Sequence, residues 1–238
     1  CSRSPYMTSR SHIDTAVLVQ SLSPGALPVT WRDPLYDDEA RWFMTAVAEG
    51  VVEFRDCPDD CPRRRKWDAP GPDHFTTPTG AARHLFSYPT HHTAWLSREY
   101  VPHIAAYARA ILELGFASAP RSFSRYRKYR RDLVHRRAGH SYETDAEFYN
   151  SDGTIALQIE AKKSPRDVAG LVAAIESAHR LSELAPKACK EVEYVLDLSP
   201  EQLWVVGPGS IDPALHIFDV RVDGLDATFT PSALRPPR

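Results

Sequence analysis

Apolar and polar positions follow two different patterns along the 238-residue chain. From residue 93 onward, apolar residues recur at helix or strand spacing in almost every segment, whereas residues 56–92 form a Cys- and Pro-rich stretch without such spacing. A long irregular loop of this kind is uncommon inside a compact domain unless it is functional, metal-bound or flexible. We therefore expect an N-terminal extension over residues 1–92 and a separate domain over residues 93–238.

Two helices are predicted in the first half of the chain. Apolar spacing favours one over about residues 37–50, with Asp37 or Asp38 as its N-cap. Its apolar face would consist of Trp42, Phe43, Ala46 and Val47. The spacing over residues 93–116 favours a second helix, which either begins at Pro102 or is kinked there.

Residues 164–181 carry the clearest helix pattern in the chain. Ser164 is a natural N-cap, and Pro165 suits the first helical position because an N–H there would have no partner within the helix. Apolar residues then recur at helical spacing, at Val168, Leu171, Val172, Ile175 and Ala178. We expect a helix with one buried face.

Strand spacing occurs on both sides of that helix. Residues 143–149 and 155–162 alternate around Asp152-Gly153, a dipeptide that favours a tight hairpin turn. Further strands are expected over residues 191–198, 203–207 and 214–222. Strands mixed with helices predict an α/β fold, with helices packed on the faces of a sheet.

The predicted hairpin would bring charged side chains together. Because side chains alternate across a strand, Asp145 would share a face with Glu143 and Glu147. The turn would also place Asp145 opposite Glu160, with Cβ atoms roughly 5 Å apart. Like charges at that separation need compensation, either from a metal ion, from Lys162 or from solvent.

A magnesium site is the first of these alternatives. Asp145 and Glu160 would supply carboxylate oxygens and Ala161 a backbone carbonyl oxygen, a ligand set that suits Mg²⁺ or Mn²⁺. Lys162 would stabilise a phosphate or help lower the pKa of an attacking water. Gln158, two residues before Glu160, would face the same site. The other alternative is an ordinary hairpin with one core face and one solvated, charged face.

This pattern resembles the restriction-endonuclease-like superfamily, the PD-(D/E)xK nucleases. Asp145 matches the first acid of the motif, Glu160 and Lys162 match its acid-x-Lys triplet, and a helix from Pro165 follows the triplet as in the family. The resemblance covers about residues 95–200 and implies a mixed β-sheet flanked by helices, with Mg²⁺-dependent hydrolysis of phosphodiester bonds. The implied catalytic residues are Asp145, Gln158, Glu160 and Lys162.

The superfamily often adds a carboxylate from the helix before the hairpin. Glu99 and Glu113 are the candidates, and we favour Glu113 as the additional metal ligand. Two features depart from the family pattern: Thr144, not Pro, precedes Asp145, and no separate strand is evident before that residue. Two rival functions therefore stay open, a non-catalytic nucleic-acid-binding module and an interaction subunit that retains the fold.

A basic block precedes the hairpin. Residues 121–137 carry eight Lys or Arg and one Asp, residues 138–238 carry nine basic and sixteen acidic residues, and the net charge of the chain is −2. Such a block would contact phosphates, with DNA as the favoured partner. The residues expected to bind nucleic acid are Arg121, Arg125, Arg127, Lys128, Arg130, Arg131 and Lys163. The block could also be a helix that buries Phe123, Tyr126, Tyr129 and Leu133, and aromatic residues in such a stripe more often belong to a core than to a base-stacking surface.

The cysteines give a weaker metal signal. Cys57 and Cys61 have a spacing found at structural Zn²⁺ sites, but the sequence does not reveal the two further ligands, so free thiols in a loop are the alternative. Four cysteines are too few for a disulfide scaffold in a chain of this length. Because no secretory signal or long apolar run is visible, we expect a cytoplasmic protein without a membrane span. A homodimer or a partner subunit stays open.

Overall fold

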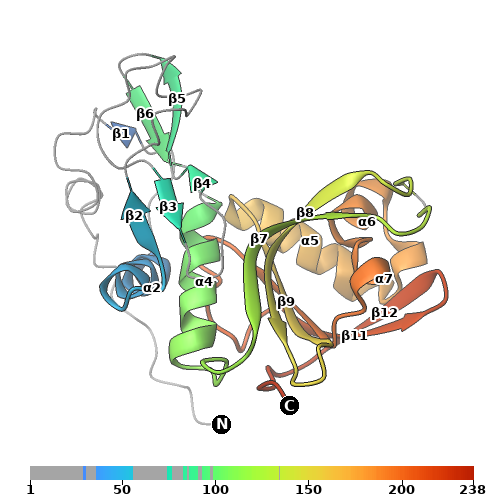
Figure 1. Ribbon diagram of the computed structural model, residues 1–238. Coiled ribbons are helices and arrows are strands. Elements are labelled where there is room, and N and C mark those ends of the chain that lie inside the picture. The colour runs from blue at the N-terminus through green and yellow to red at the C-terminus, as the bar shows by residue number, and fades with distance from the viewer. Residues whose placement is uncertain are drawn as a thin grey trace, which may run out of the picture.

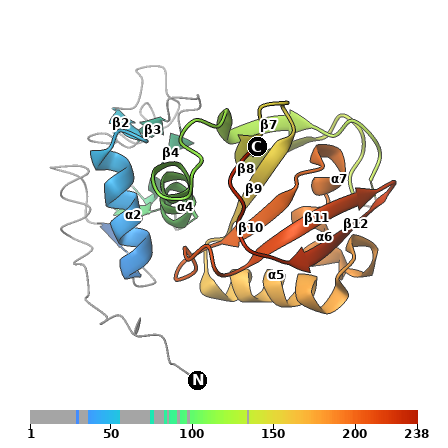
Figure 2. The ribbon, with the colours of Figure 1, turned by 90° about the horizontal axis from the view of Figure 1, so that it is seen from below.

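The protein is built around an open six-stranded mixed β-sheet with helices on both faces (Figures 1 and 2). The structure is a computed structural model that describes residues 29–30, 36–55, 74–76, 83–84, 86–90, 93–96, 99–133 and 135–238. The α/β class predicted from the sequence is confirmed. None of the helices within these ranges is both long and apolar enough to cross a membrane.

The strands of the sheet lie in the order β12-β11-β10-β9-β8-β7. They span Arg121–Lys128 (β7), Ser141–Tyr149 (β8), Ile155–Ala161 (β9), Gln202–Val206 (β10), Ile217–Asp223 (β11) and Asp226–Pro231 (β12). β9 and β10 pair in parallel, and every other neighbouring pair is antiparallel. A parallel pair needs a crossover connection, which the helices between β9 and β10 supply.

The helices divide between the two faces of the sheet. The helix α4 (Tyr100–Leu112) packs against β8, β9 and β10 on one face. The other face is covered by α5 (Pro165–Ala178), the 3₁₀ helix η1 (Leu181–Glu183), α6 (Pro186–Val192) and α7 (Val195–Leu198). The sheet is therefore buried on both sides, and this is why β9 reads as a run of buried residues from end to end.

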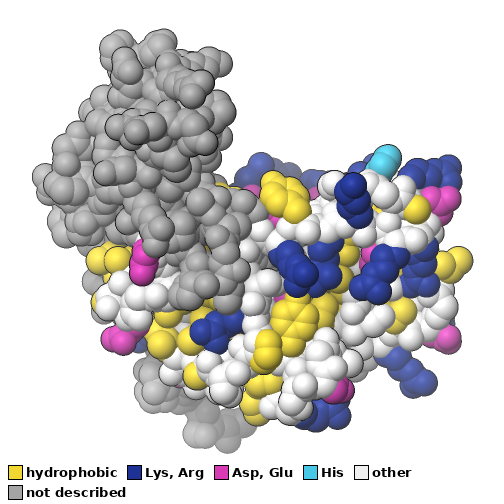
Figure 3. Space-filling view, in the orientation of Figure 1, with side chains coloured by type: hydrophobic (Ala, Val, Ile, Leu, Met, Phe, Trp, Pro, Cys, Tyr) yellow, Lys and Arg dark blue, Asp and Glu magenta, His cyan; other side chains and the backbone are white. Residues whose placement is uncertain are grey.

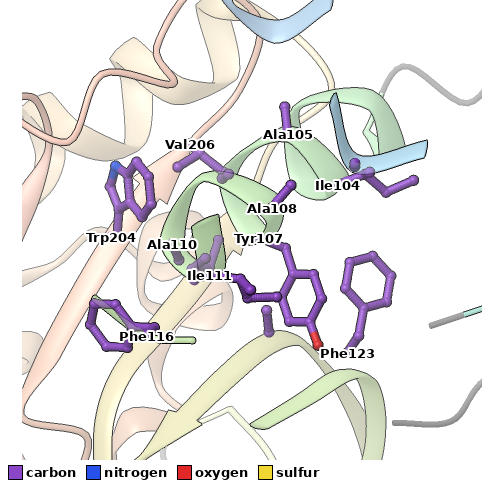
Figure 4. Close-up of a cluster of buried hydrophobic side chains, with 14 of the residues drawn as sticks. Ile104, Ala105, Tyr107, Ala108, Ala110, Ile111, Phe116, Phe123, Trp204 and Val206 are labelled. Carbon is purple, nitrogen blue, oxygen red and sulfur yellow. The ribbon is translucent and has the colours of Figure 1, made fainter. Parts of the chain in front are cut away.

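The buried helix α4 forms the centre of one hydrophobic cluster, and Figure 4 shows how its side chains meet those of the sheet. Tyr107 packs edge-on against Phe123 of β7 and at a tilt against Phe148 of β8, with ring centroids 5.0 and 5.4 Å apart. Trp204 of β10 is fully buried in the same cluster. Each large side chain buried in this way contributes about 1.5–3 kcal/mol, so α4 is firmly held against the strands.

The helix α2 (Asp37–Ala48) packs against the side of α4 away from the sheet. Its predicted apolar face is confirmed, since Phe43 and Ala46 are buried and Trp42 and Val47 pack against the same cluster. The predicted cap is wrong. Tyr36 is the N-cap, and its N–H donates to the Glu39 carboxylate at 2.9 Å. Both predicted cap residues lie instead in the first helical turn, where their charge favours the helix dipole.

Short strands occupy part of the region predicted to be irregular. One three-stranded sheet contains β1 (Val29–Thr30), β5 (Phe86–Thr90) and β6 (Thr93–Leu96), and another contains β2 (Glu53–Arg55), β3 (His74–Thr76) and β4 (Arg83–His84). The prediction of a helix from residue 93 is therefore wrong in its first turns, because β6 pairs with β1 and β5. The helix starts at Tyr100, and Pro102 fits its first turn, where no N–H is needed.

Two other segments differ from the prediction. The basic residues 121–128 form strand β7, not a helix, because they pair with β8 over the length of the strand. This is the strand before Asp145 that the sequence did not reveal. Residues 191–198, predicted as a strand, form the end of α6 and all of α7. Val192, Val195 and Leu196 are buried at helical spacing, which the apparent alternation concealed.

The hairpin and the helix after it are confirmed. β8 and β9 pair antiparallel, with Ala146 opposite Ile159. The hydroxyl of Ser164 accepts a hydrogen bond from the N–H of Asp167 at 3.2 Å and so caps α5. Gly207 then lets β10 end close to the start of α5, since a Cβ there would lie 2.3 Å from Val168 Cγ2 and 3.0 Å from the Lys162 carbonyl oxygen.

We predict opposite effects of alanine at two glycines. Gly207→Ala should lower the free energy of unfolding by about 1–3 kcal/mol, because the new methyl group overlaps Val168. Gly170→Ala, at a position in α5 where a Cβ meets no atom within 4 Å, should raise it by about 0.5–1 kcal/mol. Urea denaturation measures both values. Equal effects of the two substitutions would contradict this packing.

Candidate active site

The candidate site lies at the end of β9 opposite the hairpin turn. Asp145 is left out of both of its strand ladders, because the β8–β9 pairing starts at Ala146 with Ile159 and the β7–β8 pairing omits residue 145. Its carboxylate Oδ2 accepts a hydrogen bond of 2.6 Å from the N–H of Ala161. Glu160 is the residue before Ala161 on β9, and its charge acts on Asp145, so the two carboxylates predicted to meet do lie close together.

A local break in strand geometry accompanies Asp145. Ser124, the β7 residue that the same ladder omits, has a left-handed φ of 48°. On β8 the hydroxyl of Thr144 donates to Glu147 Oε1 at 2.7 Å, although residues three apart point to opposite faces of a regular strand. The prediction that Glu143, Asp145 and Glu147 share one face is therefore wrong across this point.

The carboxyl group of Asp145 is destabilised in its charged form. Burial raises its pKa well above the ordinary value, and the charges of Glu160 and Glu99 raise it further. The Ala161 N–H and the charge of Lys162 act in the opposite direction without reversing the shift. The site therefore holds more negative charge than its own cation offsets.

Lys162 is held between two carboxylates. Its Nζ donates to Glu160 Oε1 at 2.5 Å and to Glu191 Oε2 at 2.6 Å, and its side chain is 13% exposed. Burial alone would lower the pKa of Lys162, but the two carboxylates raise it overall. The amine is thus kept as an ammonium ion and is not a candidate general base at neutral pH.

Two residues of this cluster were missed in the sequence. Glu191 comes from α6, and Tyr194, just before α7, donates its hydroxyl to Glu160 Oε2 at 2.8 Å. Burial first, and then the charge of Glu160, raise the pKa of Tyr194 well above the ordinary value, so it stays protonated as a donor. The sequence predicted a strand over residues 191–198, and no spacing pattern relates this segment to residues some thirty positions earlier. The sequence therefore held no signal for these contacts.

Of the two candidate carboxylates at the ends of α4, Glu99 lies near the site and Glu113 does not. Glu99 precedes α4, and its pKa is raised by desolvation, lowered by Lys162 and raised by Glu160. Glu113 lies at the other end of α4 and pairs with Arg109 at 3.2 Å. The choice of Glu113 as an additional ligand is therefore wrong, because the site lies at the end where α4 begins.

Gln158 lies two residues before Glu160 on β9, further from the end of the strand. It is fully buried, and its Nε2 donates to the Ile159 carbonyl at 2.8 Å. Its Oε1 has no hydrogen-bond partner among the residues that the structure describes. A buried acceptor without a partner is costly, so this oxygen is suited to accept a hydrogen bond from a water molecule or a ligand group.

The predicted nucleic-acid-binding residues fall into two groups. Arg121 and Arg131 donate to backbone carbonyls, and Arg127 forms a buried ion pair with Glu147 at 2.5 Å. These three side chains therefore contact other parts of the protein, and Arg125 also donates to the Tyr149 hydroxyl at 3.1 Å. Side chains that are exposed belong to Arg125, Lys128, Arg130 and Lys163. Figure 3 shows Lys and Arg side chains gathered over the region of β7 and β8, so a basic surface does lie beside the candidate site.

The Glu147–Arg127 pair forms a second buried polar cluster beside the first. Burial alone would raise the pKa of Glu147, but hydrogen bonds from Arg127, Tyr149 and Thr144 lower it overall. Ser122 donates to the same carboxylate at 3.0 Å. Because these hydrogen bonds stabilise the charged form of Glu147, this carboxylate does not belong to the uncompensated negative charge around Asp145.

The residues around Asp145 fit a hard divalent cation. Asp145 and Glu160 offer carboxylate oxygens, and the carbonyl of Ala161 points to the same side of β9 as the N–H that meets Asp145. Within the described ranges, no group of three or more His, Cys, Asp or Glu side chains is placed to hold a metal. Mg²⁺ does not need such a cage, since it keeps several waters and takes one or two carboxylates.

The proposed zinc ligands Cys57 and Cys61 lie outside the described residues. Comparison of the chain with protein-family models, with curated proteins and with solved structures gives no match.

We predict that Asp145→Asn raises the melting temperature of the metal-free protein near neutral pH. Folding raises the pKa of Asp145, so at any pH above the ordinary pKa of an aspartate this carboxyl group lowers the free energy of unfolding. Asparagine removes the charge and can still accept from Ala161. Thermal unfolding in EDTA measures the change.

Asp132→Asn is the matched control. A hydrogen bond from the Ala138 N–H lowers the pKa of this exposed carboxyl group, so its charge favours the folded state and its removal should not stabilise. A melting temperature of Asp145→Asn at or below that of the wild type would contradict the proposed charge imbalance.

Proposed function

We propose that this protein is a metal-dependent nuclease that hydrolyses phosphodiester bonds of nucleic acid, with DNA as the favoured substrate. The observation that carries the proposal is that buried carboxylates with excess negative charge lie beside an ammonium group that is held in place. Asp145 and Glu160 are brought together from two strands, and Lys162 is held beside them by Glu160 and Glu191. An excess of carboxylate charge suits a divalent cation, and an adjacent ammonium suits a phosphate.

The resemblance to the PD-(D/E)xK nucleases supports this proposal. The first acid stands on β8, the acid-x-Lys triplet ends β9, and α5 follows, in the order that the resemblance implies. A mixed sheet with helices on both faces is compatible with a restriction-endonuclease-like fold. The strand β7 also supplies the element whose apparent absence spoke against the family.

Asp145, Glu160 and the Ala161 carbonyl are the residues that would hold Mg²⁺ or Mn²⁺. The bound ion would supply an activated water and offset the negative charge of the phosphate. In the reaction, the water oxygen would lose a proton and form a new bond to phosphorus, one P–O ester bond would break, and the leaving oxygen would take up a proton to become a hydroxyl group. Buried carboxylates without a cation would repel the phosphate, so metal and substrate would occupy the site together.

Lys162 would stabilise the negative charge that increases at the phosphate during this step. Its raised pKa keeps it cationic, and its two carboxylate partners fix the position of Nζ. A charge fixed before the reaction stabilises a transition state without reorganisation. Glu191 would act through Lys162 as a positioning residue, and Tyr194 would orient Glu160 in the same way.

The exposed basic residues would bind the phosphates on either side of the cleaved one. Arg125, Lys128 and Arg130 lie on or beside the edge strand β7, and Lys163 directly follows the triplet. Contacts of this kind give affinity without sequence preference and weaken steeply with salt. They are therefore expected to position the strand and not to read its sequence.

Lys162→Ala should reduce metal-dependent cleavage by at least about 10²-fold, the usual cost of removing one fixed transition-state charge. Lys190→Ala, which removes an exposed lysine from α6, should cleave like the wild type. Plasmid, linear duplex, single-stranded DNA and RNA, incubated with Mg²⁺, Mn²⁺ or EDTA, provide the assay. Cleavage that persists in Lys162→Ala or in EDTA would refute the proposed site.

The same assay separates the rival functions. Salt-sensitive binding without cleavage by the wild type would favour a non-catalytic binding module. Neither binding nor cleavage at low salt would favour an interaction subunit.

A further inference from the structure

Two arginines of β7 converge on one tyrosine of β8. Arg125 Nη1 and Arg127 Nη2 both donate to the hydroxyl oxygen of Tyr149, at 3.1 and 2.9 Å. Because both hydrogen bonds end on the same oxygen atom, the two guanidinium groups are close neighbours. Like charges this close repel each other unless an anion lies beside them.

A single carboxylate of the protein offsets these two cations. Arg127 donates to both oxygens of Glu147, from Nε at 2.8 Å and from Nη2 at 2.5 Å, and hydroxyl groups donate to the same carboxylate. Arg125 forms no ion pair with any residue in the part of the chain that the structure describes. The hydroxyl of Tyr149 is neutral, so the arginine pair keeps an excess of positive charge.

The arginine pair also has donors to offer. Arg125 is exposed, and the side chain of Arg127 is 18% exposed. Among the described residues, Nε and Nη2 of Arg125 and Nη1 of Arg127 donate to no acceptor. Guanidinium N–H groups lie in a planar fork that matches the oxygens of a phosphate. Figure 3 shows further Lys and Arg side chains gathered over this region of the sheet.

The arginine pair lies on the same face of the sheet as Glu160. Arg127 bonds to Glu147, which pairs across the sheet with Gln158 on β9. Glu160 follows Gln158 by two residues, and side chains two apart on a strand share a face. β8 separates β7 from β9, so the two strands lie roughly 10 Å apart. A nucleic-acid strand that crosses this face can therefore contact the arginines and the carboxylates at once.

We propose that Arg125, Arg127 and Tyr149 form a phosphate-binding site for a nucleic-acid strand, separate from the phosphate that is cleaved. Tyr149 fixes the two guanidinium groups side by side, and a phosphate would supply the negative charge that the pair lacks. Such a contact positions a strand without reading its sequence, because every nucleotide carries the same phosphate. The inference rests on the proposed nuclease only for where the strand is cut.

Binding can be measured without cleavage, by fluorescence anisotropy in EDTA. The probes are fluorescein-labelled single-stranded and duplex DNA of about 12 nucleotides, within known site sizes. Arg125→Gln should weaken binding of both probes roughly 10- to 100-fold, as expected when hydrogen bonds to a charged group are lost. The slope of log affinity against log salt concentration should decrease in magnitude by about one, since one phosphate contact is removed.

Two matched variants separate the site from general electrostatic attraction. Arg125→Lys keeps the charge but not the planar fork, so it should keep the salt slope and recover only part of the affinity. Arg221→Gln removes an exposed arginine from β11, on the far side of the sheet from β7, and should change affinity less than about twofold because distant charges are screened.

NMR of the arginine side chains reports on the site directly, including Arg127, whose substitution would break a buried ion pair. In ¹H–¹⁵N spectra, unlabelled DNA of the same sequence should shift the Nε–H signals of Arg125 and Arg127. The signal of Arg221 should stay unchanged. Shifts of all three signals by similar amounts would contradict a defined site.

Other outcomes would also overturn the inference. These are unchanged affinity in Arg125→Gln, equal losses in Arg125→Gln and Arg221→Gln, full recovery in Arg125→Lys, or no DNA binding by the wild type at low salt. Displacement of DNA by millimolar inorganic phosphate at constant ionic strength would assign the site to free phosphate instead of a nucleic-acid strand.

Addition of Mg²⁺ to the same samples tests the nuclease separately. Binding that depends on Arg125 without cleavage would refute the proposed nuclease and leave the phosphate site. Cleavage by the wild type together with unchanged affinity in Arg125→Gln would refute the phosphate site and leave the nuclease.

Discussion

The arrangement of the candidate site depends on the burial of Asp145 and on its repulsion from the neighbouring carboxylate of Glu160. Asp145 accepts a hydrogen bond from the N–H of Ala161, the residue after Glu160, and this contact keeps the two carboxylates close together. Lys162 offsets part of their charge, but it is shared with Glu191, and the pKa of Asp145 stays well above its ordinary value. The fold thus keeps an energetically unfavourable carboxyl group at Asp145, whereas hydrogen bonds satisfy the nearby Glu147 carboxylate. Such an unfavourable charge, confined to one place, is typical of a binding site.

Rigid elements on both faces of the sheet maintain this imbalance. The end of β9 is fixed to β10 by the Lys162 N–H, which donates to the Val206 carbonyl at 2.9 Å. On one face, α4 is buried against the strands and brings Glu99 to the carboxylates. On the other face, α6 carries Glu191 to Lys162. In the proposed nuclease, the covered strands would hold the carboxylates and Lys162, and exposed basic residues on or beside the edge strand β7 would contact the nucleic acid.

Local patterns predicted the elements whose structure depends on neighbours in sequence. The hairpin, the α5 cap at Ser164 and the apolar face of α2 are all short-range features, and all are confirmed. Where the structure depends on partners far apart in the sequence, the local pattern gave the wrong element. The spacing in β7 was compatible with a helix, but this segment pairs with β8, and the end of α6 was predicted as a strand. For the same reason Glu191 and Tyr194 could not be found, since only the fold brings them to Lys162 and Glu160.

We propose that a divalent cation neutralises the negative charge of Asp145 and Glu160. A pH titration of the Asp145 side-chain carboxyl by ¹³C NMR, in EDTA and again with saturating Mg²⁺, tests this proposal. We expect a pKa above the ordinary range in EDTA and a marked decrease when Mg²⁺ is added, because the metal binds only the deprotonated form. A titration that is the same with and without Mg²⁺ would contradict it.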